Sequence, residues 1–184
     1  MKYHNITKDD CHNGEGLRVV LWTSGCEHHC EECQNPITWD RTCGLEFDDA
    51  AKEEIFKYLG KKYATGLTLS GGDPLATFNR KDILELVKEV REKFPKKTIW
   101  SYTGYTFEQL LEDDLAKEIL NYLDVIVDGK YVKELRNIDL PWRGSSNQRV
   151  IDVKKSLESG EIILLYDEDT SDDYVAPTME CCNL

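Results

Sequence analysis

Three cysteines, Cys26, Cys30 and Cys33, lie within eight residues in the stretch SGCEHHCEECQNP. Cysteine thiolates are soft ligands that bind zinc and iron–sulfur clusters. The residues between them are glutamates and histidines, which are typical of a polar loop and not of the core, where isolated free cysteines are usually buried. The spacing therefore predicts a metal centre on a loop.

The number of available ligands helps to distinguish a structural zinc site from an iron–sulfur cluster. A structural zinc site usually takes a second ligand pair from a distant segment, and the chain has no second CxxC and no HxxxH motif. Zinc bound by the three cysteines with His28 or His29 as the fourth ligand remains an alternative. A [4Fe–4S] cluster normally takes four thiolates. Three cysteines would leave one iron open to a substrate or cofactor, as a catalytic metal requires.

Composition bounds the class of protein. Hydrophobic residues make up 40% of the 184 residues and charged residues 32%, which fits one globular domain with a sizeable core. The formal net charge of −12 opposes binding to phosphate backbones, so we expect no nucleic-acid partner. Because no apolar run has transmembrane length and the N-terminus lacks an apolar signal segment, we expect no membrane association and a cytoplasmic location. Clustered cysteines there favour metal or redox chemistry over disulfides.

Apolar strands alternate with amphipathic helices along the chain. Strands are predicted over 17–25, 66–74, 97–104, 124–129, 148–153 and 161–166. Helices are predicted over 47–62, 80–94 and 106–123, the last with a break near Asp113, and a short helical link over 154–159. This order is typical of a mostly parallel sheet with helical crossovers, and it has too few units for a closed eight-unit barrel. The predicted class is α/β, an open partial (β/α) barrel of about six mostly parallel strands with outer helices.

The predicted elements bring the unusual residues to one edge of the sheet. The cysteines follow the first predicted strand, SGGDP ends the second, SYTG the third and VDGKY the fourth. Ligands in parallel α/β folds bind at the carboxyl ends of the strands, so we expect these segments to share one site. We expect a single domain over 1–166, followed by a flexible acidic tail over 167–184.

The motifs resemble a known superfamily. CxxxCxxC after a first strand, with SGGDP in place of a GGE motif, resembles the radical S-adenosylmethionine (SAM) superfamily. Five further segments are similar to the activating proteins of anaerobic (class III) ribonucleoside-triphosphate reductases: NGEGLR (13–18), CQNPITWD (33–40), WSYTGYTFEQL (100–110), VDGKY (127–131) and WRGSSNQRVIDV (142–153). The resemblance runs from about residue 5 to residue 166, and WRGSSNQRVID is its most distinctive segment.

The resemblance implies a reaction and its partners. A [4Fe–4S] cluster on Cys26, Cys30 and Cys33 would bind SAM at its open iron and cleave it reductively to methionine and a 5′-deoxyadenosyl radical. That radical would take a hydrogen atom from a glycine in the C-terminal loop of the reductase large subunit. Glycine suits this role because no side chain shields its Cα. A flavodoxin or a ferredoxin-type protein would supply the electron.

The resemblance also implies contacts with SAM around the cluster. Glu32 and Gln34 flank the last cysteine and would lie near the adenine, although many superfamily members carry an aromatic residue where this chain has Glu32. Gly71 and Gly72 would let the backbone approach SAM closely, and Asp73 would accept a hydrogen bond from the methionyl amine. A simple tight turn for the two glycines and a helix cap for Asp73 remain alternatives.

Three more residues are implied at the strand ends that follow. Thr103, Asp128 and Lys130 would face the same site, and Lys130 would offset the charge of the SAM carboxylate. Positions matching Asp128 and Lys130 contact SAM or a nearby cation in related activases. Tyr102 stands where those relatives carry an acid, which leaves the cation site open. A solvated surface lysine is the alternative for Lys130.

The polar loop that begins at Arg143 and continues over 145–147 is a candidate for the reductase contact, with an ordinary surface turn as the alternative. Other classes of function also remain. An electron carrier could use the same cluster without binding SAM, and a zinc-stabilised binding module would need no iron. A nearer alternative is the activase of a different glycyl-radical enzyme, although some of those carry an extra ferredoxin-like insert with further CxxC pairs, which this chain lacks.

Overall fold

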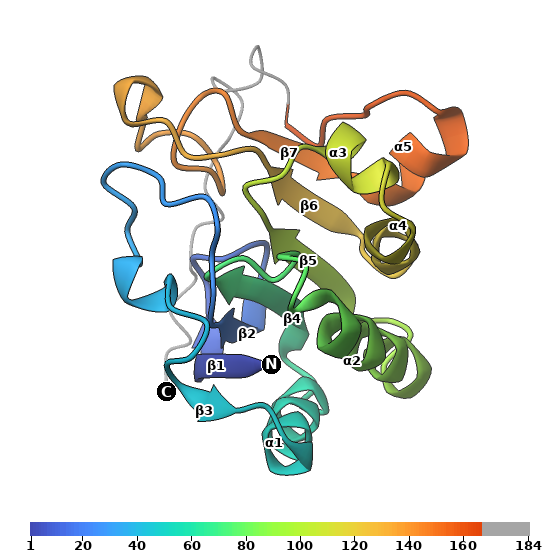
Figure 1. Ribbon diagram of the computed structural model, residues 1–184. Helices are drawn as coiled ribbons and strands as arrows, with labels where there is room; N and C mark the ends of the chain where they lie inside the picture. The colour runs from blue at the N-terminus through green and yellow to red at the C-terminus, as the bar shows by residue number, and fades with distance from the viewer. Residues whose placement is uncertain (167–184) are drawn as a thin grey trace, which may run out of the picture.

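The computed structural model describes residues 1–166, so the tail predicted over 167–184 lies outside the described residues. One mixed sheet runs through this part of the chain in the strand order β3-β1-β2-β4-β5-β6-β7. Helices α1, α2 and α4 lie along one side of the curved sheet, and long loops extend from the strand ends away from those helices (Figure 1). The fold is therefore of the α/β class.

The bounds of the elements are as follows. The strands are β1 (Lys2–Asp10), β2 (Leu17–Thr23), β3 (Leu45–Glu46), β4 (Ala64–Gly71), β5 (Thr98–Tyr102), β6 (Val125–Asp128) and β7 (Arg149–Asp152). The α-helices are α1 (Asp49–Leu59), α2 (Arg80–Lys93), α3 (Phe107–Leu111), α4 (Asp114–Leu120) and α5 (Val153–Ser159). Two short 3-10 helices are η1 (Pro36–Thr38) and η2 (Lys133–Leu135).

Four central strands form the parallel part that the sequence predicts. β2 pairs with β4, β4 with β5 and β5 with β6, all in parallel. The connections between them contain α1, α2, and α3 with α4, as crossovers between parallel strands require. Side chains from these strands and helices form the main core, which includes Leu67, Leu69, Ile99 and Ile126. The carboxyl ends of the four strands consequently lie at one edge.

The opposite face of the sheet carries polar and aromatic side chains. Trp100 packs there in a second cluster of buried apolar residues. Arg18 is 1% exposed and donates hydrogen bonds to Thr68 Oγ1 at 2.6 Å and to the Leu67 carbonyl at 2.8 Å. Burial lowers the pKa of Arg18 to about 10. Its Nη1 also donates to the Glu15 carbonyl at 3.2 Å, so this side chain ties the NGEGLR segment to the inner face of the sheet.

The edges of the sheet differ from the prediction. β1, which was not predicted, pairs antiparallel with β2, and its mostly polar sequence KYHNITKDD gave no strand signal. β7 was predicted as a strand, and it pairs antiparallel with β6. The strand predicted over 161–166 is wrong, because that segment makes one isolated bridge, Ile151 with Leu164. Its apolar character reflects packing of Ile162 and Leu164 against the core and not membership of a sheet.

The helix predicted over 106–123 is broken where expected. α3 begins with a capping box, in which Thr106 and Gln109 satisfy each other's backbone N–H groups. The Asp113 carboxylate then accepts a hydrogen bond from Ala116 N and starts α4. Within residues 1–166, no helix is long and apolar enough to cross a membrane.

Candidate functional site

The three cysteines lie on the loop formed by residues 24–35, here called the cysteine loop, which joins β2 to η1. Hydrogen bonds fix its first part: Gly25 N donates to the Thr38 carbonyl at 2.7 Å, and Cys26 N donates to the Trp39 carbonyl at 3.1 Å. Two of its residues that are not glycine adopt left-handed backbone angles, His29 at φ 47° and Glu32 at φ 54°. Such angles make sharp reversals possible and keep the three cysteines in one compact loop.

A cavity of about 570 Å³ opens beside this loop. Its lining includes Cys26, Cys30 and Cys33, the β4 end at 70–73 and the β5 end at 102–104. Its volume falls within the range of small-molecule sites. The structure therefore brings the cysteines, SGGDP and SYTG together, as strand order alone predicts, whereas VDGKY contributes Gly129 and Tyr131 but neither Asp128 nor Lys130.

Two glycines at the end of β4 make close contact with the cysteine loop and β2. Gly71 has φ +102°, and a Cβ there would lie 2.6 Å from the backbone N and O of Thr23. A Cβ on Gly72 would lie 2.4 Å from the Gly25 carbonyl oxygen. Because real Cβ atoms do not approach backbone so closely, only glycine fits at either position. The paired glycines thus hold the β4 end against the base of the cysteine loop and leave backbone facing the cavity.

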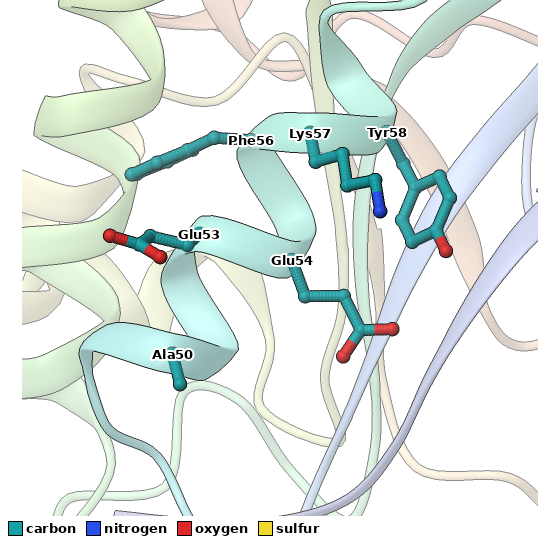
Figure 2. Close-up of a pocket in the computed structure, with 6 residues that line it drawn as sticks. All are labelled: Ala50, Glu53, Glu54, Phe56, Lys57 and Tyr58. Carbon is teal, nitrogen blue, oxygen red and sulfur yellow. The ribbon is translucent and has the colours of Figure 1, made fainter.

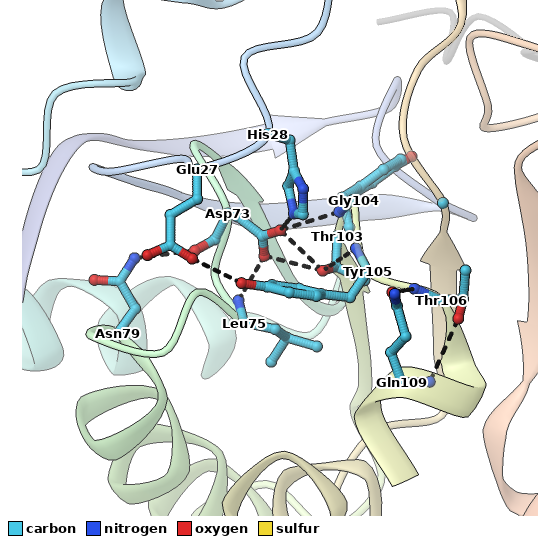
Figure 3. A network of polar contacts seen from close by, with 12 residues as sticks. Glu27, His28, Asp73, Leu75, Asn79, Thr103, Gly104, Tyr105, Thr106 and Gln109 are labelled. Carbon is cyan, nitrogen blue, oxygen red and sulfur yellow. Dashed lines mark hydrogen bonds and ion pairs between the residues drawn. The ribbon is translucent and has the colours of Figure 1, made fainter. Parts of the chain in front are cut away.

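Asp73 is the centre of a network of polar contacts between three segments (Figure 3). Its side chain is 1% exposed. Oδ1 accepts from Leu75 N at 2.8 Å, and Oδ2 accepts from Gly104 N at 3.0 Å. The Thr103 hydroxyl lies 3.0 Å from both oxygens, and His28 Nε2 lies 2.7 Å from Oδ2. The cysteine loop, β4 and β5 therefore meet at this carboxylate.

The remaining residues implied to contact SAM lie in different surroundings. Gln34 and Thr103 line the cavity. Glu32 is exposed and forms an ion pair with Lys133 at 2.7 Å. Lys130 is also exposed, and its carbonyl accepts a hydrogen bond from Asn147 Nδ2 at 2.8 Å. Neither Glu32 nor Lys130 belongs to the cavity lining.

Asp128 is buried at the end of β6, outside the cavity lining. Its carboxylate accepts from Phe107 N at 2.7 Å and pairs with Arg149. Arg149 also pairs with Glu108 at 2.8 Å, and this contact lowers the pKa of Glu108 to about 2. Asp128 consequently joins the start of α3 to β7.

The loop that begins at Arg143 is divided between the interior and the surface. Arg143 is 9% exposed, lines the cavity and donates from Nη1 to the Gln148 carbonyl at 2.9 Å, whereas its buried Nε has no hydrogen-bond partner. Ser145 is fully buried, and its hydroxyl accepts from Val132 N at 3.2 Å. Ser146 and Asn147 are exposed, so only these two remain available on the surface for the predicted partner contact.

His28, which the sequence suggests only as an alternative fourth zinc ligand, lines the cavity. Its side chain is 7% exposed and lies edge-on to Tyr105, with ring centroids 4.6 Å apart. In the sequence, His28 is visible only as a histidine between two candidate cysteine ligands. Its partner Asp73 is 45 residues away. The contact becomes visible only when the fold brings the cysteine loop next to the end of β4.

The chemistry of the lining fits an iron–sulfur cluster beside a small ligand. Three thiols from one loop share the cavity with the glycine backbone. Burial raises the pKa of the Cys26 thiol to about 11, so binding of a metal there releases a proton. Within residues 1–166, no three His, Cys, Asp or Glu side chains already form a metal-binding group. The cysteine donors are therefore present in one cavity but are not preassembled at coordination distance.

A second hollow, of about 670 Å³, lies beside α1. Residues from one helix surface line it: Ala50, Glu53, Glu54, Phe56, Lys57 and Tyr58. The carboxylates of Glu53 and Glu54 point apart there (Figure 2). Because its polar groups do not converge on a common point, this hollow lacks the arrangement expected of a reactive site.

Comparisons with known proteins agree with the chemistry of the lining. Residues 12–151 match a family model described as a 4Fe–4S single cluster domain. The anaerobic ribonucleoside-triphosphate reductase-activating protein of Enterobacteria phage T4 is 47% identical over 150 residues, which cover 82% of this chain and 93% of that protein. The proteins with the same name from Pasteurella multocida and Escherichia coli K12 are each 41% identical, over 80% and 82% of this chain and 95% and 97% of their own lengths. The chain belongs to the family of anaerobic ribonucleoside-triphosphate reductase-activating proteins.

Proposed function

We propose that this protein activates an anaerobic ribonucleoside-triphosphate reductase by generating a glycyl radical. A [4Fe–4S] cluster on Cys26, Cys30 and Cys33 would supply one electron for cleavage of SAM to methionine and a 5′-deoxyadenosyl radical, which takes a hydrogen atom from a glycine near the reductase C-terminus. The observation that supports this proposal is one cavity lined by three thiols and by the SGGDP backbone.

The chain's own residues would bind and orient the reacting groups. Three cysteines would leave one iron of a four-iron cluster without a protein thiolate, and SAM would be the ligand that completes it. Gly71 and Gly72 line the cavity and carry no side chain, and we assign their main chain to the contact with the methionyl part of SAM. Gln34 and Thr103 are the polar side chains of the lining that we assign to the SAM contact.

The other part of the cavity is aromatic. Trp22, Tyr102 and Trp142 line it, and burial raises the pKa of the Tyr102 hydroxyl, which keeps this group neutral. A radical needs surroundings from which water is excluded. These side chains therefore suit the passage of the radical to the glycine of the partner.

We also propose a fold type, a partner, an electron donor and a cellular location for the protein. We assign the curved sheet, with its parallel strands β2, β4, β5 and β6, to the open partial barrel of the radical SAM type. Residues 1–166 would form its single domain. The reductase large subunit is the proposed partner, a flavodoxin or a ferredoxin-type protein the electron donor, and the cytoplasm the location.

Anaerobic turnover tests the proposal. The protein is reconstituted with iron and sulfide, reduced with dithionite and mixed with SAM, and 5′-deoxyadenosine and methionine are measured. We expect both products from the wild type and none from Cys30→Ala. Cys43→Ala is the matched control, because Cys43 is an exposed cysteine outside the cavity lining, and this variant should retain the activity.

A second measurement concerns the partner. Addition of the reductase should produce a glycyl radical that is visible by electron paramagnetic resonance (EPR), and the amount formed should depend on SAM. A brown protein that forms no products with or without the reductase would point to an electron carrier. A colourless protein that holds one zinc ion would contradict the proposal altogether.

A further inference from the structure

The Asp73 carboxylate has no acceptor capacity left for a ligand. An ionised carboxylate has about four lone-pair directions. Four donors already use them: the main-chain N–H groups of Leu75 and Gly104, the Thr103 hydroxyl and His28 Nε2. Asp73 is a lining residue of the cavity, but its side chain is only 1% exposed. A methionyl amine could bind it only by displacing one of them.

We propose, on the basis of the proposed function, that Asp73 is a positioning residue. Its carboxylate joins the cysteine loop to the ends of β4 and β5 through His28, and it does not accept a hydrogen bond from the methionyl amine. His28 is two residues from both Cys26 and Cys30. A fixed His28 ring therefore restrains the backbone between two of the proposed cluster ligands.

The surroundings of His28 are shaped to hold its ring in one place. A Cβ on Gly104 would lie 2.3 Å from the ring of His28, so the absence of a side chain at Gly104 makes room for it. Tyr105 packs edge-on against the same ring. Since a carboxylate only accepts hydrogen bonds, Nε2 of His28 must carry the proton in this pair.

The three glutamates of the cysteine loop also make contacts, all nearer to solvent. Glu27 Oε2 accepts from the Tyr105 hydroxyl at 2.8 Å. Lys133 forms ion pairs with Glu31 at 3.1 Å and with Glu32 at 2.7 Å. Exposed ion pairs contribute little, whereas the buried pair of His28 and Asp73 is shielded from water. We therefore assign to that pair the main side-chain restraint on the part of the loop between Cys26 and Cys30.

Cluster retention is the direct measurement. The loaded proteins are mixed with an iron chelator without oxygen, and the rate of iron release is followed by absorbance. His28→Leu and Asp73→Asn should each release iron faster, by about 10- to 100-fold, the range for loss of a group that orients metal ligands. In the double variant the two effects should not multiply, because either change alone breaks the same contact.

Control variants separate this contact from general damage. Asp40→Asn removes an exposed carboxylate whose hydrogen bonds lie within its own turn, to Thr42 and Cys43, and it should match the wild type. His28→Gln keeps a side-chain N–H donor and should restore part of the retention. Circular dichroism of the unloaded proteins checks folding, and His28→Leu carries the test if Asp73→Asn does not fold.

The amine is tested with a SAM analogue that lacks the amino group. The affinities of SAM and of this analogue are compared in the wild type and in Asp73→Asn by the change in the EPR spectrum of the reduced cluster. A positioning role predicts that the ratio of the two affinities stays the same. A ratio that falls to about one in Asp73→Asn alone would show that Asp73 binds the amine, and it would overturn the inference.

The two proposals can fail separately. A wild-type protein that binds no iron–sulfur cluster, or does not cleave SAM, would contradict the proposed function. A wild-type protein that does both, with His28→Leu releasing iron as slowly as the wild type, would contradict the positioning role of Asp73 alone.

Discussion

At the scale of the residue, the site depends on positions where no side chain fits. The end of β4 touches the cysteine loop through Gly72, and β5 touches it through Gly104, where the His28 ring fills the space. Contacts of this kind make the cysteine loop, which is polar and largely outside the sheet, a firm part of the fold.

Gly72→Ala tests these contacts. The added Cβ would lie 2.4 Å from the Gly25 carbonyl oxygen and 2.9 Å from that of Thr38. Both are backbone atoms that cannot rotate away, so we expect the free energy of unfolding to fall by about 1–3 kcal/mol. Urea unfolding of the protein without cluster measures it. Gly60→Ala is the control, because its Cβ would have no neighbour closer than 3.3 Å. Equal stability of the two variants would refute the expectation.

The same residues show what sequence can predict about a site. The cysteines are recognisable from their spacing along the chain, and the paired glycines from their position at the end of a predicted strand. Asp73 was also singled out, but its surroundings depend on donors from His28 and Thr103, which are distant in the chain. No local pattern predicts that these donors occupy both carboxylate oxygens. The proposed role of Asp73 therefore changes once the tertiary contacts are known.

At the scale of the element, strand prediction succeeded where burial on both faces accompanied continuous apolar runs, as in β2 and β6. It failed at β1, whose side chains are mostly half-exposed and polar, and whose place in the sheet comes from pairing with β2. The opposite error at 161–166 has the same origin, because an apolar run reports burial and not hydrogen-bonded pairing.

Glu108→Gln tests the connection between α3 and β7. Arg149 lowers the pKa of Glu108 to about 2, below the usual value near 4.3 for glutamate. The ion pair therefore stabilises the fold above about pH 4.3 and loses this effect as the pH falls toward 2. Because the Glu108 side chain is 56% exposed, we expect a loss of at most about 1 kcal/mol at pH 7.

Urea unfolding between pH 7 and pH 3 measures this difference, which should shrink steadily as the solution becomes more acidic. Glu112→Gln, at the other end of the same helix, is the control and should change stability little at any pH. A difference for Glu108→Gln that grows toward low pH would contradict the assignment of the pKa shift to Arg149.

At the scale of the whole molecule, the main core and the candidate site lie on different parts of the sheet. Helices cover one face and supply most of the core, whereas the cavity lies at the carboxyl ends of the parallel strands. Under the proposed function a large partner must reach this cavity from outside. Ile37 on η1, next to the cysteine loop, is 72% exposed, and we infer that the partner covers this apolar side chain when it binds.

Ile37→Ser should therefore weaken the complex with the reductase. Loss of one well-buried apolar contact costs roughly 1–1.5 kcal/mol, or about a 10-fold rise in Kd. Ile37 does not line the cavity, so SAM cleavage without the reductase should be unchanged. Tyr63→Ser is the matched control, because Tyr63 is 52% exposed and precedes β4, at the end of the strands away from the cavity. Titration of labelled reductase gives Kd, and equal values for the two variants would place the partner on another surface.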